Sequence, residues 1–138
     1  MIFMQTKILV VEDDTDVLDL LRLSFKREGF AIATATNGVD AVKKAGSLLP
    51  DVILLDVMLP QLDGFAVCKL LRKDPATASI PVVMMTGLPG QRTESTGMES
   101  GATEFVPKPI NLKYLIARVR QLLHHQGPKS SDVQECVK

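Results

Sequence analysis

Carboxylates directly follow two apolar segments of this 138-residue sequence. Glu12 and Asp13 come after the run KILVV, and Asp56 ends a second run, DVILLD. Three carboxylates brought together would repel one another, and one of them would tend to take up a proton unless a cation lay between them. Mg²⁺ prefers oxygen ligands, keeps several waters and is commonly held by one or two carboxylates. The pattern therefore predicts a magnesium site, if the fold brings the two segments together.

A hydroxyl and an amine follow two later apolar segments in the same way. Thr86 ends PVVMMT, and Lys108 comes directly after EFVP. An ionised Asp56 beside Mg²⁺, an ammonium and a hydroxyl would be a nucleophile that faces groups able to stabilise negative charge. That chemistry suits formation of an aspartyl phosphate. Each residue alone has an ordinary explanation as a helix cap, a strand residue or a solvated charge, and only their joint placement indicates a site.

Alternating strands and helices must position these residues. Short apolar runs predict strands at 7–11, 30–35, 51–56, 81–86 and 104–106. Apolar residues at helical spacing predict helices at 13–28, 39–49, 64–73, a short one from about 91, and one capped by Asn111 that extends to Leu123. The alternation predicts an α/β fold, with a doubly wound five-stranded parallel sheet covered on both faces. Ligands of such sheets bind beyond the carboxyl ends of the strands.

Composition narrows the class of protein. The formal net charge is zero, which gives no electrostatic reason to expect a nucleic acid or a membrane surface as a direct partner. No apolar stretch reaches the roughly 20 residues of a membrane helix, and the pattern before the first strand gives no reason to expect a signal peptide. The cysteines, Cys68 and Cys136, fall in a predicted helix and in a polar tail, so a reducing cytoplasm is expected. We predict one domain at 5–125 and a flexible tail or linker at 126–138.

The motifs resemble those of response-regulator receiver domains in two-component signalling. The resemblance extends from about Lys7 to His125 and rests on ILVVEDD, DVILLDVMLPQLDGF, IPVVMMTG and GATEFVPKP. It implies a flavodoxin-like receiver fold with strand order 2-1-3-4-5. It also implies a cis peptide bond between Lys108 and Pro109.

The resemblance assigns a role to each candidate residue and a class to each partner. It implies that Asp56 accepts the phosphoryl group and that Lys108 pairs with this group. It also implies that Asp13 binds Mg²⁺ directly, that Glu12 binds it through water, and that the Met58 carbonyl completes the metal site. Thr86 and Phe105 would form a switch. The expected donor is a sensor histidine kinase or a phosphotransfer protein. An unknown downstream protein is expected at the face of the fourth helix, fifth strand and fifth helix, and a homodimer remains open. The chain would catalyse only its own phosphorylation and dephosphorylation.

Two other functions remain as alternatives. The first is a receiver-like docking domain that works without phosphate. The second is a phosphotransfer hydrolase with an aspartate nucleophile, which usually needs another acid two residues later, where Met58 stands here. The segment 87–100 also departs from the family because it is rich in glycine, serine and threonine. Glycine disfavours helix, so the fourth helix is expected to be short or mobile.

Overall fold

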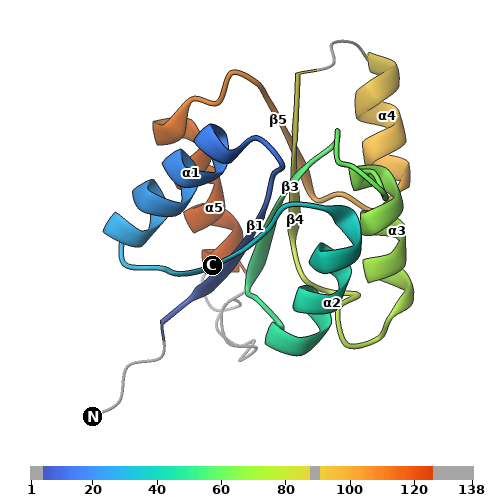
Figure 1. The fold of residues 1–138 in the computed structure, drawn as a ribbon, viewed down its shortest axis with the longest axis horizontal. Helices are drawn as coiled ribbons and strands as arrows, with labels where there is room; N and C mark the ends of the chain where they lie inside the picture. Colours follow the sequence, from blue (N-terminus) through green and yellow to red (C-terminus); the bar gives the residue numbers. More distant parts are fainter. Residues whose placement is uncertain (1–4, 88–90, 126–138) are drawn as a thin grey trace, which may run out of the picture.

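The computed structural model describes residues 5–87 and 91–125. Within these residues five strands and five helices alternate along the chain (Figure 1). They are β1 (Lys7–Val11), α1 (Thr15–Arg27), β2 (Ala31–Ala35), α2 (Gly38–Leu48), β3 (Val52–Asp56), α3 (Gly64–Lys73), β4 (Val82–Thr86), α4 (Gln91–Glu99), β5 (Glu104–Pro107) and α5 (Leu112–His125). The strands form one parallel sheet in the order β2-β1-β3-β4-β5, which confirms the predicted fold. The predicted tail, 126–138, lies outside the described residues.

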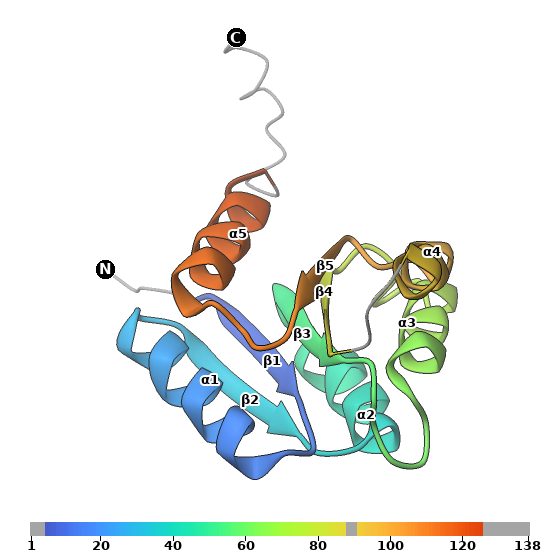
Figure 2. The ribbon, with the colours of Figure 1, turned by 90° about the horizontal axis from the view of Figure 1, so that it is seen from above.

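Helices cover both faces of the sheet. Figures 1 and 2 show α1 and α5 on one face and α2, α3 and α4 on the other. Side chains of β1 alternate between the two layers: Ile8 and Val10 belong to the core beneath α1 and α5, whereas Leu9 and Val11 belong to the core beneath α2 and α3. Because both faces are covered, β3 and β4 are buried along their whole length, which explains their unbroken apolar sequences.

Capping side chains set where the helices begin. The Asp14 carboxylate accepts hydrogen bonds from the backbone N–H groups of Asp16 and Val17, at 2.9 and 3.3 Å. Helix α1 therefore begins two residues later than predicted, and Asp13 lies outside the helix, at the edge of the sheet. Asn111 accepts from the Tyr114 N–H at 3.1 Å, which confirms the predicted cap of α5.

Helix α4 has nine residues, so the prediction of a short fourth helix is confirmed. The segment that follows it is bound by Arg72 of α3, whose Nε donates to the Gly101 carbonyl at 2.9 Å. The Nη1 of the same guanidinium donates to the carbonyls of Ile80 and Ala78, at 2.7 and 3.2 Å. Gly101 has a φ of 105° and a Cβ there would lie 2.6 Å from Arg72 Cγ, so both its backbone and its contact require glycine.

None of the helices that the structure describes, within residues 5–87 and 91–125, has both the length and the apolar character needed to cross a bilayer.

Candidate functional site

The carboxyl ends of β1 and β3 bring three carboxylates together. The strands are neighbours and pair Val11 with Leu55, so the residues that follow meet at one edge of the sheet. One oxygen atom each from Glu12, Asp13 and Asp56 can be chosen so that all three lie within 4.8 Å of one another. Glu12 is 1% exposed and Asp56 3% exposed, whereas Asp13 is exposed. The acid cluster is therefore a buried pair that opens to solvent beside Asp13.

This cluster suits a hard divalent cation. Mg²⁺ takes oxygen ligands and retains water, and here oxygen atoms converge on a site with one exposed side. The site lies in an open pocket of about 360 Å³. Its lining residues are Glu12, Asp13, Asp14, Asp56, Met58, Gly87 and Lys108. The Met58 side chain is 60% exposed, while its N–H donates to Asp56 Oδ1 at 3.3 Å, so the backbone of this residue lies against the acid cluster.

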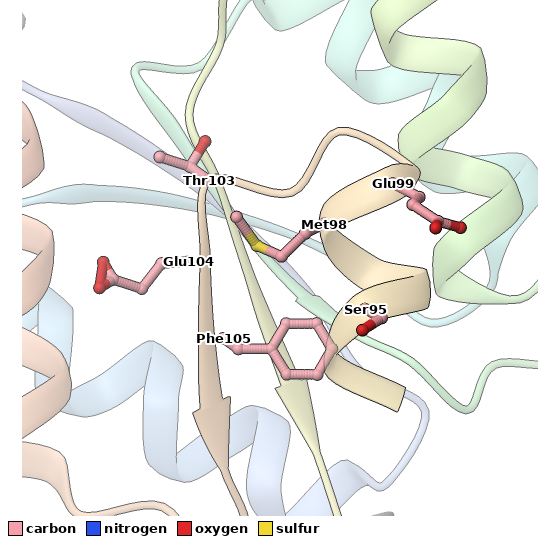
Figure 3. Close-up of a pocket in the computed structure, with 6 residues that line it drawn as sticks. All are labelled: Ser95, Met98, Glu99, Thr103, Glu104 and Phe105. Atoms are coloured by element: carbon pink, nitrogen blue, oxygen red, sulfur yellow. The ribbon is translucent and has the colours of Figure 1, made fainter. Parts of the chain in front are cut away.

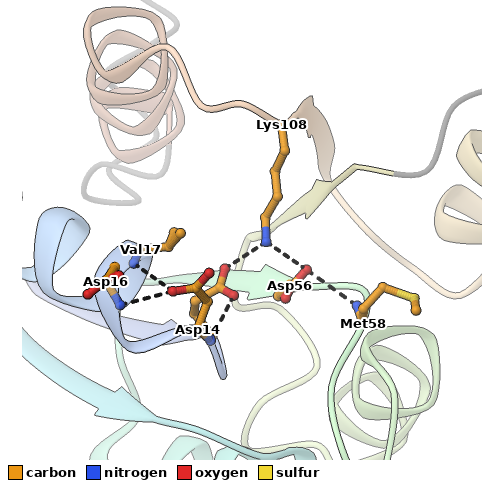
Figure 4. A network of polar contacts seen from close by, with 7 residues as sticks. Asp14, Asp16, Val17, Asp56, Met58 and Lys108 are labelled. Atoms are coloured by element: carbon orange, nitrogen blue, oxygen red, sulfur yellow. Dashed lines mark hydrogen bonds and ion pairs between the residues drawn. The ribbon is translucent and has the colours of Figure 1, made fainter.

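Lys108 joins the two buried carboxylates. Its Nζ lies 2.9 Å from Glu12 Oε1 and 3.3 Å from Asp56 Oδ1 (Figure 4). The residue directly follows β5, and its N–H donates to the Thr86 carbonyl at 2.8 Å, which fixes its backbone beside the end of β4. The peptide bond from Lys108 to Pro109 is cis, as predicted. The ammonium group of a residue directly after β5 thus reaches one acid directly after β1 and another at the end of β3.

Burial and charge shift the pKa values of Glu12 and Lys108. Burial raises the pKa of Glu12 to about 6; the hydrogen bond from Lys108 opposes this rise, and the charge of Asp56 adds to it. Burial lowers the pKa of Lys108, but the hydrogen bond to Glu12 and the charges of Asp56 and Glu12 together raise it above its ordinary value. Lys108 is therefore a cation at neutral pH. Burial is thus the main cause of the raised pKa of Glu12, and the charge of Asp56 adds to it.

The predicted switch residues lie on neighbouring strands and on the same face of the sheet. Thr86 ends β4 and is 5% exposed. On β5, Phe105 pairs with Met84, two residues before Thr86, and side chains two residues apart on a strand point to the same side. The Phe105 ring packs on the core beneath α2 and α3. Thr86 lies at the site edge and Phe105 farther from it.

Two residues that support the acid cluster are not predicted by the sequence pattern. The N–H of Asp14 donates to Glu12 Oε2 at 3.2 Å, so the residue that caps α1 also orients a buried acid. Gly64, at the start of α3, approaches the end of β3 so closely that a Cβ would lie 2.5 Å from the Asp56 carbonyl oxygen. In the sequence, Gly64 directly follows Asp63, the residue that caps α3. A glycine at the start of a helix suggests that another backbone approaches closely there, so this position could have indicated the contact.

Comparison with known proteins places this chain in a family. The family model for the response regulator receiver domain matches residues 8–120. The response regulator PleD from Caulobacter vibrioides is 46% identical over 119 residues, which cover 86% of this chain and 26% of PleD. The alkaline phosphatase synthesis transcriptional regulatory protein PhoP from Bacillus subtilis is 40% identical over 120 residues, covering 87% of this chain and 49% of PhoP. The chain thus spans between a quarter and a half of these relatives.

Solved structures agree with the sequence comparison. A two-component response regulator from Clostridium difficile superposes with a TM-score of 0.84 at 31% identity, covering 90% of this chain and 100% of that one. The receiver domain of sensor histidine kinase PA1611 from Pseudomonas aeruginosa, solved with a magnesium ion in its active-site cleft, superposes with a TM-score of 0.82. It covers 88% of this chain and 99% of its own, and at 22% identity it supports the fold alone. Strand order, family match and superposition agree: the chain belongs to the response regulator receiver domains, which are signalling modules of two-component systems.

Proposed function

We propose that this chain accepts a phosphoryl group on Asp56 from the phosphohistidine of a sensor histidine kinase or a phosphotransfer protein. The observation that carries the proposal is the setting of Asp56. It is a buried carboxylate at the end of β3, within 4.8 Å of oxygen atoms from Glu12 and Asp13 and 3.3 Å from the Lys108 ammonium. Membership of the receiver family supports the same assignment. A cytoplasmic location, which the free thiol of Cys68 fits, is part of the proposal.

The transfer step exchanges one bond to phosphorus for another. The bond between the histidine nitrogen and phosphorus breaks as a bond forms from an Asp56 carboxylate oxygen, and the electron pair of the broken bond remains on the imidazole. Lys108 would offset negative charge on the phosphoryl oxygens, and the hydroxyl of Thr86, the last residue of β4, would donate to one of them. Asp13, Asp56 and the Met58 carbonyl would hold Mg²⁺, with Glu12 acting through water. When bound, Mg²⁺ would neutralise the acids and polarise the phosphoryl group.

The proposed output is a change at the face formed by α4, β5 and α5. Movement of Thr86 toward the phosphoryl oxygens would leave space for Phe105 to turn inward, which biases an equilibrium between two arrangements. Phe105 also borders an open groove of about 610 Å³ between α4 and β5 (Figure 3). The lining residues of this output groove are Ser95, Met98, Glu99, Thr103, Glu104 and Phe105. Rotation of Phe105 would therefore remove one wall of the groove.

The side chains of the output groove suggest what a downstream protein would offer. Met98 is 52% exposed and, with Phe105, presents apolar surface. Glu99 and Glu104 add negative charge, although Arg118 of α5 already binds Glu104, with Nη2 at 2.6 and 2.7 Å from its two oxygens. A partner segment with an apolar anchor next to a basic side chain fits this lining, and a second copy of the chain is the competing occupant.

A phosphorylation assay tests the proposal against the two alternatives. The protein is incubated with Mg²⁺ and a small phosphodonor such as acetyl phosphate, and its intact mass is measured. One phosphate per wild-type molecule is expected, and none in Asp56→Asn. Asp51→Asn is the matched control, because Asp51 lies exposed next to the opposite end of β3 and binds the Lys7 N–H at 2.8 Å. No adduct in the wild type would favour the docking domain, and rapid repeated consumption of the donor would favour the hydrolase.

A further inference from the structure

We infer that Gly38, the first residue of α2, is a positioning residue for the magnesium site and acts through the loop between β3 and α3, residues 57–63. The inference rests on the proposed function, because it concerns how the chain holds Mg²⁺. A Cβ at position 38 would lie 2.1 Å from the Leu62 carbonyl oxygen and 2.6 Å from Leu62 Cβ. Since a Cβ atom essentially never lies within 3.0 Å of a heavy atom of a residue that is not its chain neighbour, α2 and the loop can meet this closely only at glycine.

The loop contains a strained turn at the point where α2 touches it. The Leu62 N–H donates to the Pro60 carbonyl at 2.7 Å, and the residue between them, Gln61, has a φ of 69°. Such a γ-turn with positive φ is rare, and in a residue other than glycine it persists only when its surroundings fix it. Leu62 supplies that fixation, because its side chain packs on the core beneath α2 and α3 while its backbone rests on Gly38.

The other end of the loop is equally constrained. The Gly64 N–H donates to the Val57 carbonyl at 2.8 Å, and a Cβ on Gly64 would lie 2.8 Å from Val57 Cα. Met58 lies between the two constraints, with its N–H on Asp56 Oδ1 at 3.3 Å. The Val57 N–H also donates to the Met85 carbonyl, at 3.1 Å. The placement of the loop therefore determines where the Met58 backbone lies relative to the acids, and Gly38 is one of the contacts that set this placement.

A side chain at position 38 would displace the loop. To lengthen the contact with the Leu62 oxygen from 2.1 Å to at least 3.0 Å, the backbones must separate by about 0.9 Å. Mg²⁺ requires nearly ideal octahedral geometry at short metal–oxygen distances, so transmission of even part of this shift from Leu62 to the Met58 backbone should weaken binding. The carboxylates of Glu12 and Asp13 lie on another segment, after β1, and would remain in place.

The test compares two glycine-to-alanine substitutions in the same helix. Gly38→Ala introduces the contact with Leu62, whereas a Cβ at Gly46 meets no atom within 4 Å, so Gly46→Ala is the matched control. The Mg²⁺ dissociation constant is measured by calorimetry, and backbone amide shifts are measured by NMR in metal-free protein. Gly38→Ala should weaken Mg²⁺ binding about ten-fold, as loss of an outer-shell support does in other metal sites, with the largest amide shifts at Met58 and Leu62. Gly46→Ala should match the wild type in both measurements.

The outcomes separate this inference from the proposed function. No Mg²⁺ binding by the wild type would overturn both. Normal binding by the wild type and equal binding by Gly38→Ala would overturn the inference alone, as would an equal loss in Gly46→Ala. The metal-free melting temperature shows whether Gly38→Ala is folded. If it is not, Leu62→Ala loosens the loop while leaving Gly38 intact, and it should weaken Mg²⁺ binding about three-fold or more; unchanged affinity in that variant would overturn the inference.

Discussion

The ring of Phe105 on β5 rests directly on Gly97 of α4. A Cβ at position 97 would lie 2.0 Å from Phe105 Cε1 and 2.6 Å from Cζ, and Figure 3 shows the ring pointing toward that helix. The present position of the ring thus depends on the absence of a side chain at one residue of α4. Because Phe105 is the proposed switch aromatic, Gly97 bears on the equilibrium between its two positions.

We expect Gly97→Ala to shift that equilibrium toward the inward position of Phe105. The methyl group excludes the present ring position, and a bias of about 1.4 kcal/mol changes the ratio of two states ten-fold. The initial rate of phosphorylation by acetyl phosphate should rise about three- to ten-fold without any kinase, because the inward arrangement accompanies the phosphorylated state. Combining Gly97→Ala with Phe105→Ala removes the clash, so an acceleration that persisted in the double variant would rule out the ring as its cause.

Asp13→Asn should weaken Mg²⁺ binding at least ten-fold and prevent phosphorylation. It removes one of three converging carboxylates, and an amide is a poorer ligand for a hard cation. Asp14→Asn is the control, because the Asp14 side chain caps α1 and asparagine caps helices about as well as aspartate. Calorimetric titration of both variants checks the prediction. Similar affinities in the two variants would mean that only the net charge of the segment matters.

Glu12 should make the stability of the metal-free protein depend on pH. Its pKa is raised from 4.5 to about 6 in the folded state, so the folded protein binds more protons than the unfolded chain between these values. The free energy of unfolding should therefore fall as pH rises through this window, by about 2 kcal/mol for this group. Urea unfolding at pH 4 and pH 7 would show this loss in the wild type relative to Glu12→Gln. If the difference in free energy of unfolding between the two proteins were the same at pH 4 and pH 7, it would contradict the raised pKa of Glu12.

Phosphorylated wild-type protein should lose its phosphoryl group slowly. Hydrolysis requires a water in line with the bond from Asp56 to phosphorus, and the thioether of Met58, which lines the pocket, cannot orient that water by a strong hydrogen bond. Met58→Asn supplies an amide and should speed decay several-fold, as followed by intact mass over time. Leu88, which we also expect to border the water, lies outside the described residues. Equal decay of wild type and Met58→Asn would show that Met58 has no such role.

The acid cluster could be predicted correctly from the sequence because a general rule connects distant residues. The carboxyl ends of parallel strands share one edge of a sheet, so Lys108 could be placed beside Glu12 although 96 residues separate them. The predicted start of α1 is two residues too early because three acids in a row follow β1, and only the observed hydrogen bonds identify Asp14 as the cap.

The close glycine contacts could not be predicted in the same way. In the sequence, Gly97 indicates only a residue that weakens a helix, whereas the structure shows that it provides room for Phe105. Gly38 indicates a turn or cap next to Asn37, and its contact with Leu62 depends on how two separate segments pack. Local patterns report backbone preference and average burial, but not which backbones will touch.

The guanidinium of Arg72 has a mechanical consequence for α4. It holds the carbonyl of Gly101, just after the end of the helix, to the carbonyls of Ile80 and Ala78 before β4, at the edge of the sheet opposite Asp56. We therefore expect any reorientation of α4 to be a rotation about this end of the helix. Nine residues of helix span about 13 Å at 1.5 Å per residue, so a tilt of about 10° would move the far end by about 2 Å. The displacement is therefore largest at Gln91, the end of α4 that follows the carboxyl end of β4 in the chain, and smallest at Gly101.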